Sequence, residues 1–74
     1  MLMEMKGFLP WFPTITPEKF RELRESIGYS QEELAEYMGV NTRTVGRWEL
    51  GRTRIPQACS FLLLYLVLQI KTKS

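Results

Sequence analysis

Four arginines fall within twelve residues in the second half of the chain, at Arg43, Arg47, Arg52 and Arg54, with Glu49 as the only acid among them. A guanidinium group carries several N–H donors in a fixed fork, which suits the paired acceptors of a phosphate or of a guanine edge. Arg43 and Arg47 are four residues apart, about one helical turn, whereas the other two follow a glycine. These residue types favour recognition of a polyanion over catalysis.

The charges are divided unevenly along the chain. Residues 1–40 hold four basic residues and seven glutamates, whereas residues 41–74 hold six basic residues and one glutamate. A protein that turns one face toward a polyanion has this charge distribution. An uneven but solvated surface explains the division equally well, so charge alone does not identify a partner.

Catalytic and metal chemistry has few residues to use. The chain contains no His and no Asp, and Cys59 is its single cysteine. These absences exclude a Ser-His-Asp triad and leave a zinc ion with one soft ligand. The glutamates lie mostly at helix-face spacing among Lys and Arg, and no two are set apart as an acid–base pair. We therefore expect no enzyme, no metal and no cofactor.

The segments that position these residues are predicted to be helices, at about residues 17–27, 31–38, 42–50 and 56–70. Thr16 is a capping residue before a proline at the first helical position. Ser30 with Glu33 three residues later forms a capping box, and Gly39 closes that helix. Asn41 is the expected N-cap of the third helix. Because no strand alternation occurs, the fold class is all-α, with four helices or five.

The domain is predicted to span residues 17–70, between an N-terminal arm and a basic C-terminal tail at residues 71–74. Pro10 and Pro13 argue against a helix in residues 1–16. Trp11 and Phe12 belong to an apolar stretch there, and we expect it to pack as an arm on the domain or on a partner chain.

The last predicted helix has one polar residue, Ser60, between positions 59 and 68. This run is shorter than the roughly 20 residues of a membrane span. A helix that is apolar on every side needs cover on every side. We therefore expect a second copy of the chain to cover part of it. The expected dimer interface consists of Phe61, Leu64, Tyr65 and Leu68, with Trp11 and Phe12.

Residues 31–50 form a twenty-residue unit with apolar, small and turn residues at set places. These are Leu34, Met38, Val40, Val45 and Trp48, with Ala35 and Gly39. The unit lies within FRELRESIGYSQEELAEYMGVNTRTVGRWELG, which resembles the Xre family, the phage-repressor and Cro type of helix-turn-helix protein. The SQEELA segment, the MGV turn and the RWE-x-G ending carry the resemblance, which covers about residues 17–66. It implies a compact lambda-repressor-like domain.

The resemblance also implies roles for particular residues. The third helix would lie in the major groove of DNA and read bases through Thr42, Arg43, Thr44 and Arg47. Contacts to phosphates would come from Gln31, Asn41, Arg52, Thr53 and Arg54. Arg24 and Glu49 would form a buried ion pair that ties the first helix to the third.

The function implied is a sequence-specific transcriptional regulator of double-stranded DNA, acting in the cytoplasm at the nucleoid. We expect a homodimeric repressor on an inverted-repeat operator, of a phage or mobile-element type. Repressors that silence their own operon, including those encoded beside anti-CRISPR genes, are of this kind. One alternative is the antitoxin of a toxin–antitoxin operon, whose arm binds the toxin. Another is a protein-interaction module that uses the last helix, although Arg43 and Arg47 argue against it.

Overall fold

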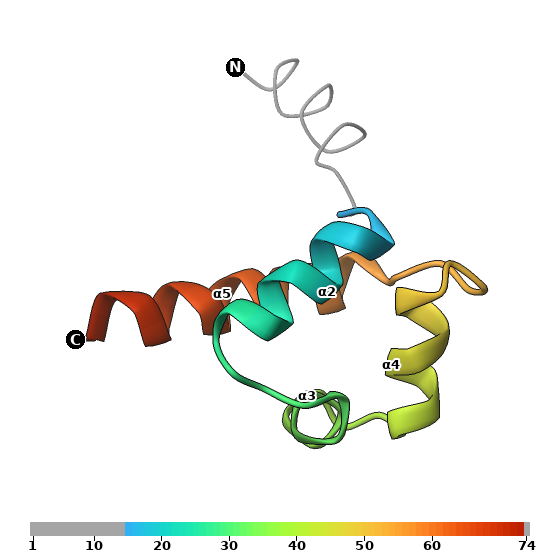
Figure 1. Ribbon diagram of the computed structural model, residues 1–74, viewed down its shortest axis with the longest axis horizontal. Coiled ribbons are helices and arrows are strands. Elements are labelled where there is room, and N and C mark those ends of the chain that lie inside the picture. The colour runs from blue at the N-terminus through green and yellow to red at the C-terminus, as the bar shows by residue number, and fades with distance from the viewer. Residues whose placement is uncertain (1–14, 74) are drawn as a thin grey trace, which may run out of the picture.

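The computed structural model describes residues 15–73 as four helices with no strand among them (Figure 1). The helices are α2 (Pro17–Ser26), α3 (Gln31–Met38), α4 (Thr42–Glu49) and α5 (Gln57–Lys73). The all-α fold class is therefore confirmed, with four helices in this part of the chain. The predicted contribution of Trp11 and Phe12 lies outside the described residues.

The helix starts follow from local hydrogen bonds. The Thr16 hydroxyl accepts a hydrogen bond from the Lys19 N–H at 3.1 Å. In the capping box, the Ser30 hydroxyl accepts from the Glu33 N–H at 3.0 Å, and the Glu33 carboxylate accepts from the Ser30 N–H at 2.8 Å. Gly39 has a φ of 74° and ends α3 in the left-handed conformation, as predicted. The unpaired N–H groups of α2 and α3 are thus partly satisfied by their own flanking residues.

Asn41 is the N-cap residue of α4, as predicted. Asn41 has the extended backbone of an N-cap residue, but its side chain makes no capping hydrogen bond. The first turn is held by the backbone instead, because the Thr44 and Val45 N–H groups both donate to the Asn41 carbonyl, at 2.9 and 3.3 Å. The exposed Asn41 amide is therefore not committed to holding the helix.

The ends of α5 also differ from the expectation. Pro56 lies just before the helix, where its carbonyl accepts hydrogen bonds from the N–H groups of Cys59 and Ser60 at 3.0 and 3.1 Å. At the other end the helix runs to Lys73, so residues 71–73 continue it and are not a separate tail. No Gly or Pro follows Ile70 in the sequence to end the helix there, so the helix can continue through residues 71–73.

The core lies among the four helices, where α3 packs on α4 and α2 packs on both α4 and α5. Its buried hydrophobic residues are Phe20, Leu34, Ala35, Val45, Trp48, Ile55, Leu63 and Leu66. The rings of Phe20 and Trp48 meet edge to face, with 5.7 Å between centroids. Figure 1 shows α2 running along α5, while α4 lies toward the end of the molecule opposite the C-terminus. The packing fixes the angle between α3 and α4.

Candidate nucleic-acid interface

A buried ion pair joins α2 to the end of α4. Arg24 Nε donates to Glu49 Oε2 at 2.6 Å, and Arg24 Nη2 donates to Glu49 Oε1 at 3.0 Å. The two side chains are 10% and 5% exposed, so solvent screens the pair weakly. The hydrogen bond to Glu49 raises the pKa of Arg24 above its usual value, and the charges of Glu49 and Glu25 add to this. The structure thus brings together the two residues that the resemblance paired.

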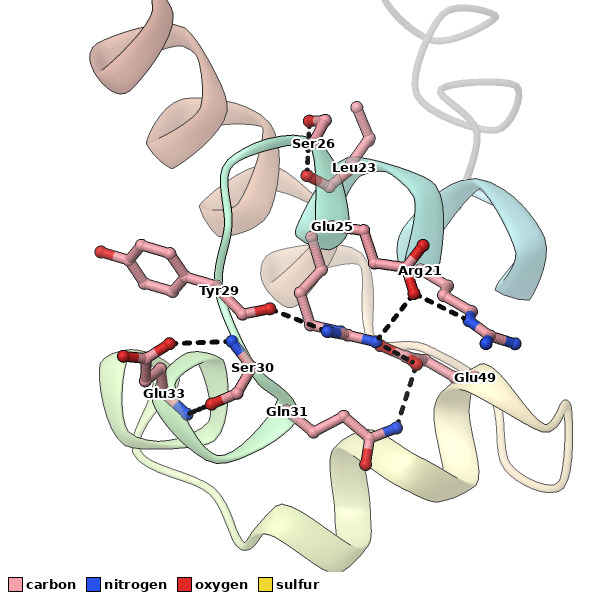
Figure 2. A network of polar contacts seen from close by, with 10 residues as sticks. Arg21, Leu23, Glu25, Ser26, Tyr29, Ser30, Gln31, Glu33 and Glu49 are labelled. Carbon is pink, nitrogen blue, oxygen red and sulfur yellow. Dashed lines mark hydrogen bonds and ion pairs between the residues drawn. The ribbon is translucent and has the colours of Figure 1, made fainter.

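Two further contacts extend this pair into the turn before α3. Arg24 Nη1 donates to the Tyr29 carbonyl at 2.8 Å, and Gln31 Nε2 donates to Glu49 Oε1 at 3.0 Å. Figure 2 shows Gln31 extending from the start of α3 toward Glu49. The family resemblance implies only a phosphate contact for Gln31, so its hydrogen bond to Glu49 is an additional role. A buried carboxylate such as that of Glu49 has more acceptor sites than one guanidinium fills. The sequence therefore offered one indication that a second donor would be found beside Arg24.

The face of α4 that points away from the core carries the predicted base-reading residues. Val45 and Trp48 are buried, whereas Thr42, Arg43 and Arg47 are exposed. Thr44, which we also predicted to read bases, is half-buried at the edge of that face. Neither arginine forms an ion pair with another described residue. Their guanidinium groups therefore remain available to a ligand.

The loop after α4 carries the remaining basic residues. Arg52, Thr53 and Arg54 are exposed, while Ile55 is buried and anchors the loop to the core. The Arg52 N–H donates to the Arg47 carbonyl at 2.9 Å, which joins the loop to the last turn of α4. Figure 1 shows α4 and this loop at the same end of the molecule. Together they form one basic surface, which we call the basic edge: Arg43, Arg47, Arg52 and Arg54.

Negative charge borders this surface on α3. Glu32, Glu33 and Glu36 are all exposed there, whereas the half-buried Gln31 begins the helix. A polyanion is repelled by the three carboxylates and attracted by the basic edge. The charges therefore favour an approach of a polyanion over α4 and the loop.

The described residues contain neither a group of side chains suited to a metal ion nor a helix long and apolar enough to cross a membrane.

On α5 the predicted interface residues Leu64, Tyr65 and Leu68 are 37%, 56% and 61% exposed, and Phe61 is 43% exposed. Apolar surface on this side of α5 thus faces away from the core.

A helix-turn-helix domain is defined by two short helices joined by a glycine turn. The first helix has a small residue where it crosses the second, and the second helix has a basic outer face. A helix-turn-helix family matches residues 20–58, which is more than half of the chain. The chain belongs to this family, of the Xre type that its sequence resembles, and it is a DNA-binding domain of the helix-turn-helix regulator kind.

A protein of Pyrococcus furiosus named as an HTH-type transcriptional regulatory protein is 47% identical to the chain over 51 residues. The match covers 69% of this chain and 15% of that relative, so the chain spans a small part of the relative's length. No solved structure matches the chain.

Proposed function

We propose that the chain is a homodimeric transcriptional repressor that binds an inverted-repeat operator and blocks a promoter. The observation that carries the proposal is the outer face of α4, where Arg43 and Arg47 are exposed and free of ion pairs with other described residues. The name of the Pyrococcus furiosus relative supports a role in transcription. Phage and mobile-element regulators that silence their own operon are the kind of repressor we favour.

In this proposal the basic edge has two tasks. Arg43 and Arg47 enter the major groove with Thr42 and Thr44, and each arginine offers two parallel donors to the O6 and N7 atoms of guanine. Arg52 and Arg54 lie on a loop outside the helix and contact phosphates, which hold the protein in register without reading sequence. Gln31, Asn41 and Thr53 add neutral donors to phosphates.

The hydrogen bonds around Glu49 hold α4, the proposed base-reading helix, in place. Glu49 lies two residues after Arg47 and is held by Arg24 from α2 and by Gln31 from α3. These bonds fix the end of α4 relative to the start of α3. A reading helix that is held rigidly loses little conformational freedom when it binds, so more of the contact energy appears as affinity.

Selection from a random pool of DNA duplexes tests the proposal. We expect enrichment of two inverted half-sites whose centres are about one helical turn, 10–10.5 base pairs, apart. A reporter promoter that contains the enriched sequence should lose activity when the protein is present. Enrichment of no sequence, or activation of that promoter, would show that the chain is not such a repressor.

A further inference from the structure

Gly46 is a glycine in the interior of α4 that the fold does not require. Its carbonyl accepts a hydrogen bond from the Leu50 N–H at 3.0 Å, and it is not one of the glycines with positive φ. A glycine inside a helix lowers helix stability relative to alanine. The chain thus contains a destabilising residue for which backbone conformation gives no reason.

Packing gives no reason either. Among the described residues outside its own helix and its chain neighbours, a Cβ on Gly46 would come nearest to Gln31 Oε1, at 3.9 Å. That distance is an ordinary van der Waals contact, so alanine fits in the free protein. The three other described glycines, Gly28, Gly39 and Gly51, all have positive φ and a conformational explanation that Gly46 lacks.

The neighbours of Gly46 on the surface of α4 indicate which ligand group could occupy the space that its missing side chain leaves. Thr42 and Arg43 precede it by four and three residues, so they are its neighbours on the helix surface. Both are exposed, and Gln31 lies on the other side at the start of α3. Gly46 therefore leaves a gap on the surface that we propose faces the major groove, between an arginine that reads bases and a residue that contacts phosphate.

The chemistry of the gap limits what can fill it. The backbone polar groups of Gly46 belong to the helical hydrogen-bond ladder, so the glycine itself presents carbon and hydrogen to the gap and no free donor, beside the amide oxygen of Gln31. The apolar group that base edges present in the major groove is the C5-methyl of thymine. We infer that Gly46 is a specificity-determining residue that admits a thymine methyl group against α4, an inference that rests on the proposed DNA-binding function.

The Gly46→Ala variant tests this inference, first through stability. Because alanine favours the helix and fits, we expect the thermal midpoint of the free protein to rise by roughly 4–8 °C. The same variant should bind the operator selected by the natural chain about tenfold more weakly, since its methyl group and the thymine methyl compete for one space. A fall of the midpoint would show that the fold requires the glycine and would overturn the inference.

Replacing each operator thymine by deoxyuridine, one position at a time, identifies the partner of Gly46. At one position per half-site the natural chain should lose about fourfold in affinity, because one buried methyl contact is lost. At that same position the Gly46→Ala variant should instead regain most of its lost affinity, since the added methyl now fills the vacated space. Substitution at the other thymines serves as the control.

Two results would overturn the inference and leave the proposed function intact. In one, the Gly46→Ala variant binds the thymine operator as tightly as the natural chain. In the other, it loses affinity equally with thymine and deoxyuridine at every position. If the natural chain selects no sequence from the random pool, the proposed function and the inference fail together.

Discussion

Glu49 accepts hydrogen bonds from Arg24 on α2 and from Gln31 on α3, although it belongs to α4. Removing one partner of a buried charge pair leaves the other charge unpaired, which costs about 3–5 kcal/mol. Arg24→Ala should therefore leave so small a domain largely unfolded at 25 °C. Chemical denaturation followed by circular dichroism measures the loss.

An exposed ion pair on the same helix provides the control. Arg21 Nε and Glu25 Oε2 are 3.3 Å apart, but their side chains are 63% and 55% exposed. Arg21→Ala should cost only about 0.5 kcal/mol, because solvent screens such a pair. Equal losses of stability in the two variants would contradict the role given to the buried pair.

At the scale of the element, the two helix starts within the helix-turn-helix unit differ in what holds them. The Ser30 hydroxyl accepts the Glu33 N–H at 3.0 Å, whereas the Asn41 side chain makes no capping hydrogen bond. Ser30→Ala should lower the free energy of unfolding by about 1 kcal/mol, the usual value of a cap. Asn41→Ala should change it by much less.

The same two variants should also differ in their affinity for DNA. Because the Asn41 amide is exposed and not used as a cap, we expect it to contact a phosphate, so Asn41→Ala weakens binding to operator and scrambled duplex alike. Thermal unfolding and titration of both duplexes measure the two effects. A large stability loss in Asn41→Ala would show that the side chain caps α4 in solution.

The sequence indicated the helices well because their boundaries depend on neighbouring residues. A capping box and a glycine turn act over four residues or fewer, so spacing reveals them. The extension of α5 to Lys73 was missed because the residues after Ile70 carry no stop signal and tolerate either conformation. The contacts from Gln31 to Glu49 and from Arg24 to Tyr29 depend on tertiary placement, which helix periodicity does not encode.

The candidate site was predictable to a similar extent. Periodicity placed Val45 and Trp48 inward and the arginines outward, and the burial of α4 agrees. The pairing of Arg24 with Glu49 came from the family resemblance, since the two residues are 25 positions apart. The buried Ser60 hydroxyl, which has no hydrogen-bond partner among the described residues, had no signal in the sequence pattern.

At the scale of the whole molecule, the exposed apolar side of α5 bears on assembly. Tyr65 and Leu68 are 56% and 61% exposed, and burying them in a two-fold dimer would remove apolar area from water. Such a dimer would place two α4 helices about 34–36 Å apart, to meet successive turns of the major groove. We expect Tyr65→Glu to give monomers that bind the operator much more weakly.

Tyr37→Glu provides the matched control, because Tyr37 is also an exposed tyrosine, 41% accessible, but lies on α3. Sedimentation velocity at tens of micromolar should show dimers for the natural chain and for Tyr37→Glu. A monomeric natural chain that still binds its operator tightly would refute the proposed assembly.

The basic edge is divided between arginines that read bases and arginines that hold phosphates, and the proposed function depends most on this division. Arg43→Ala and Arg47→Ala should each cost about 1–3 kcal/mol on the selected operator and little on scrambled duplex. Arg52→Ala and Arg54→Ala should weaken both duplexes about equally, and each should reduce the salt dependence of binding by about one unit.

Titration of these four variants against operator and scrambled duplex, at several salt concentrations, is the most direct measurement of this division. The predicted result is a loss of sequence preference confined to the two α4 variants. If Arg43→Ala and Arg47→Ala instead lose affinity equally on both duplexes, α4 does not read bases and the central claim is wrong.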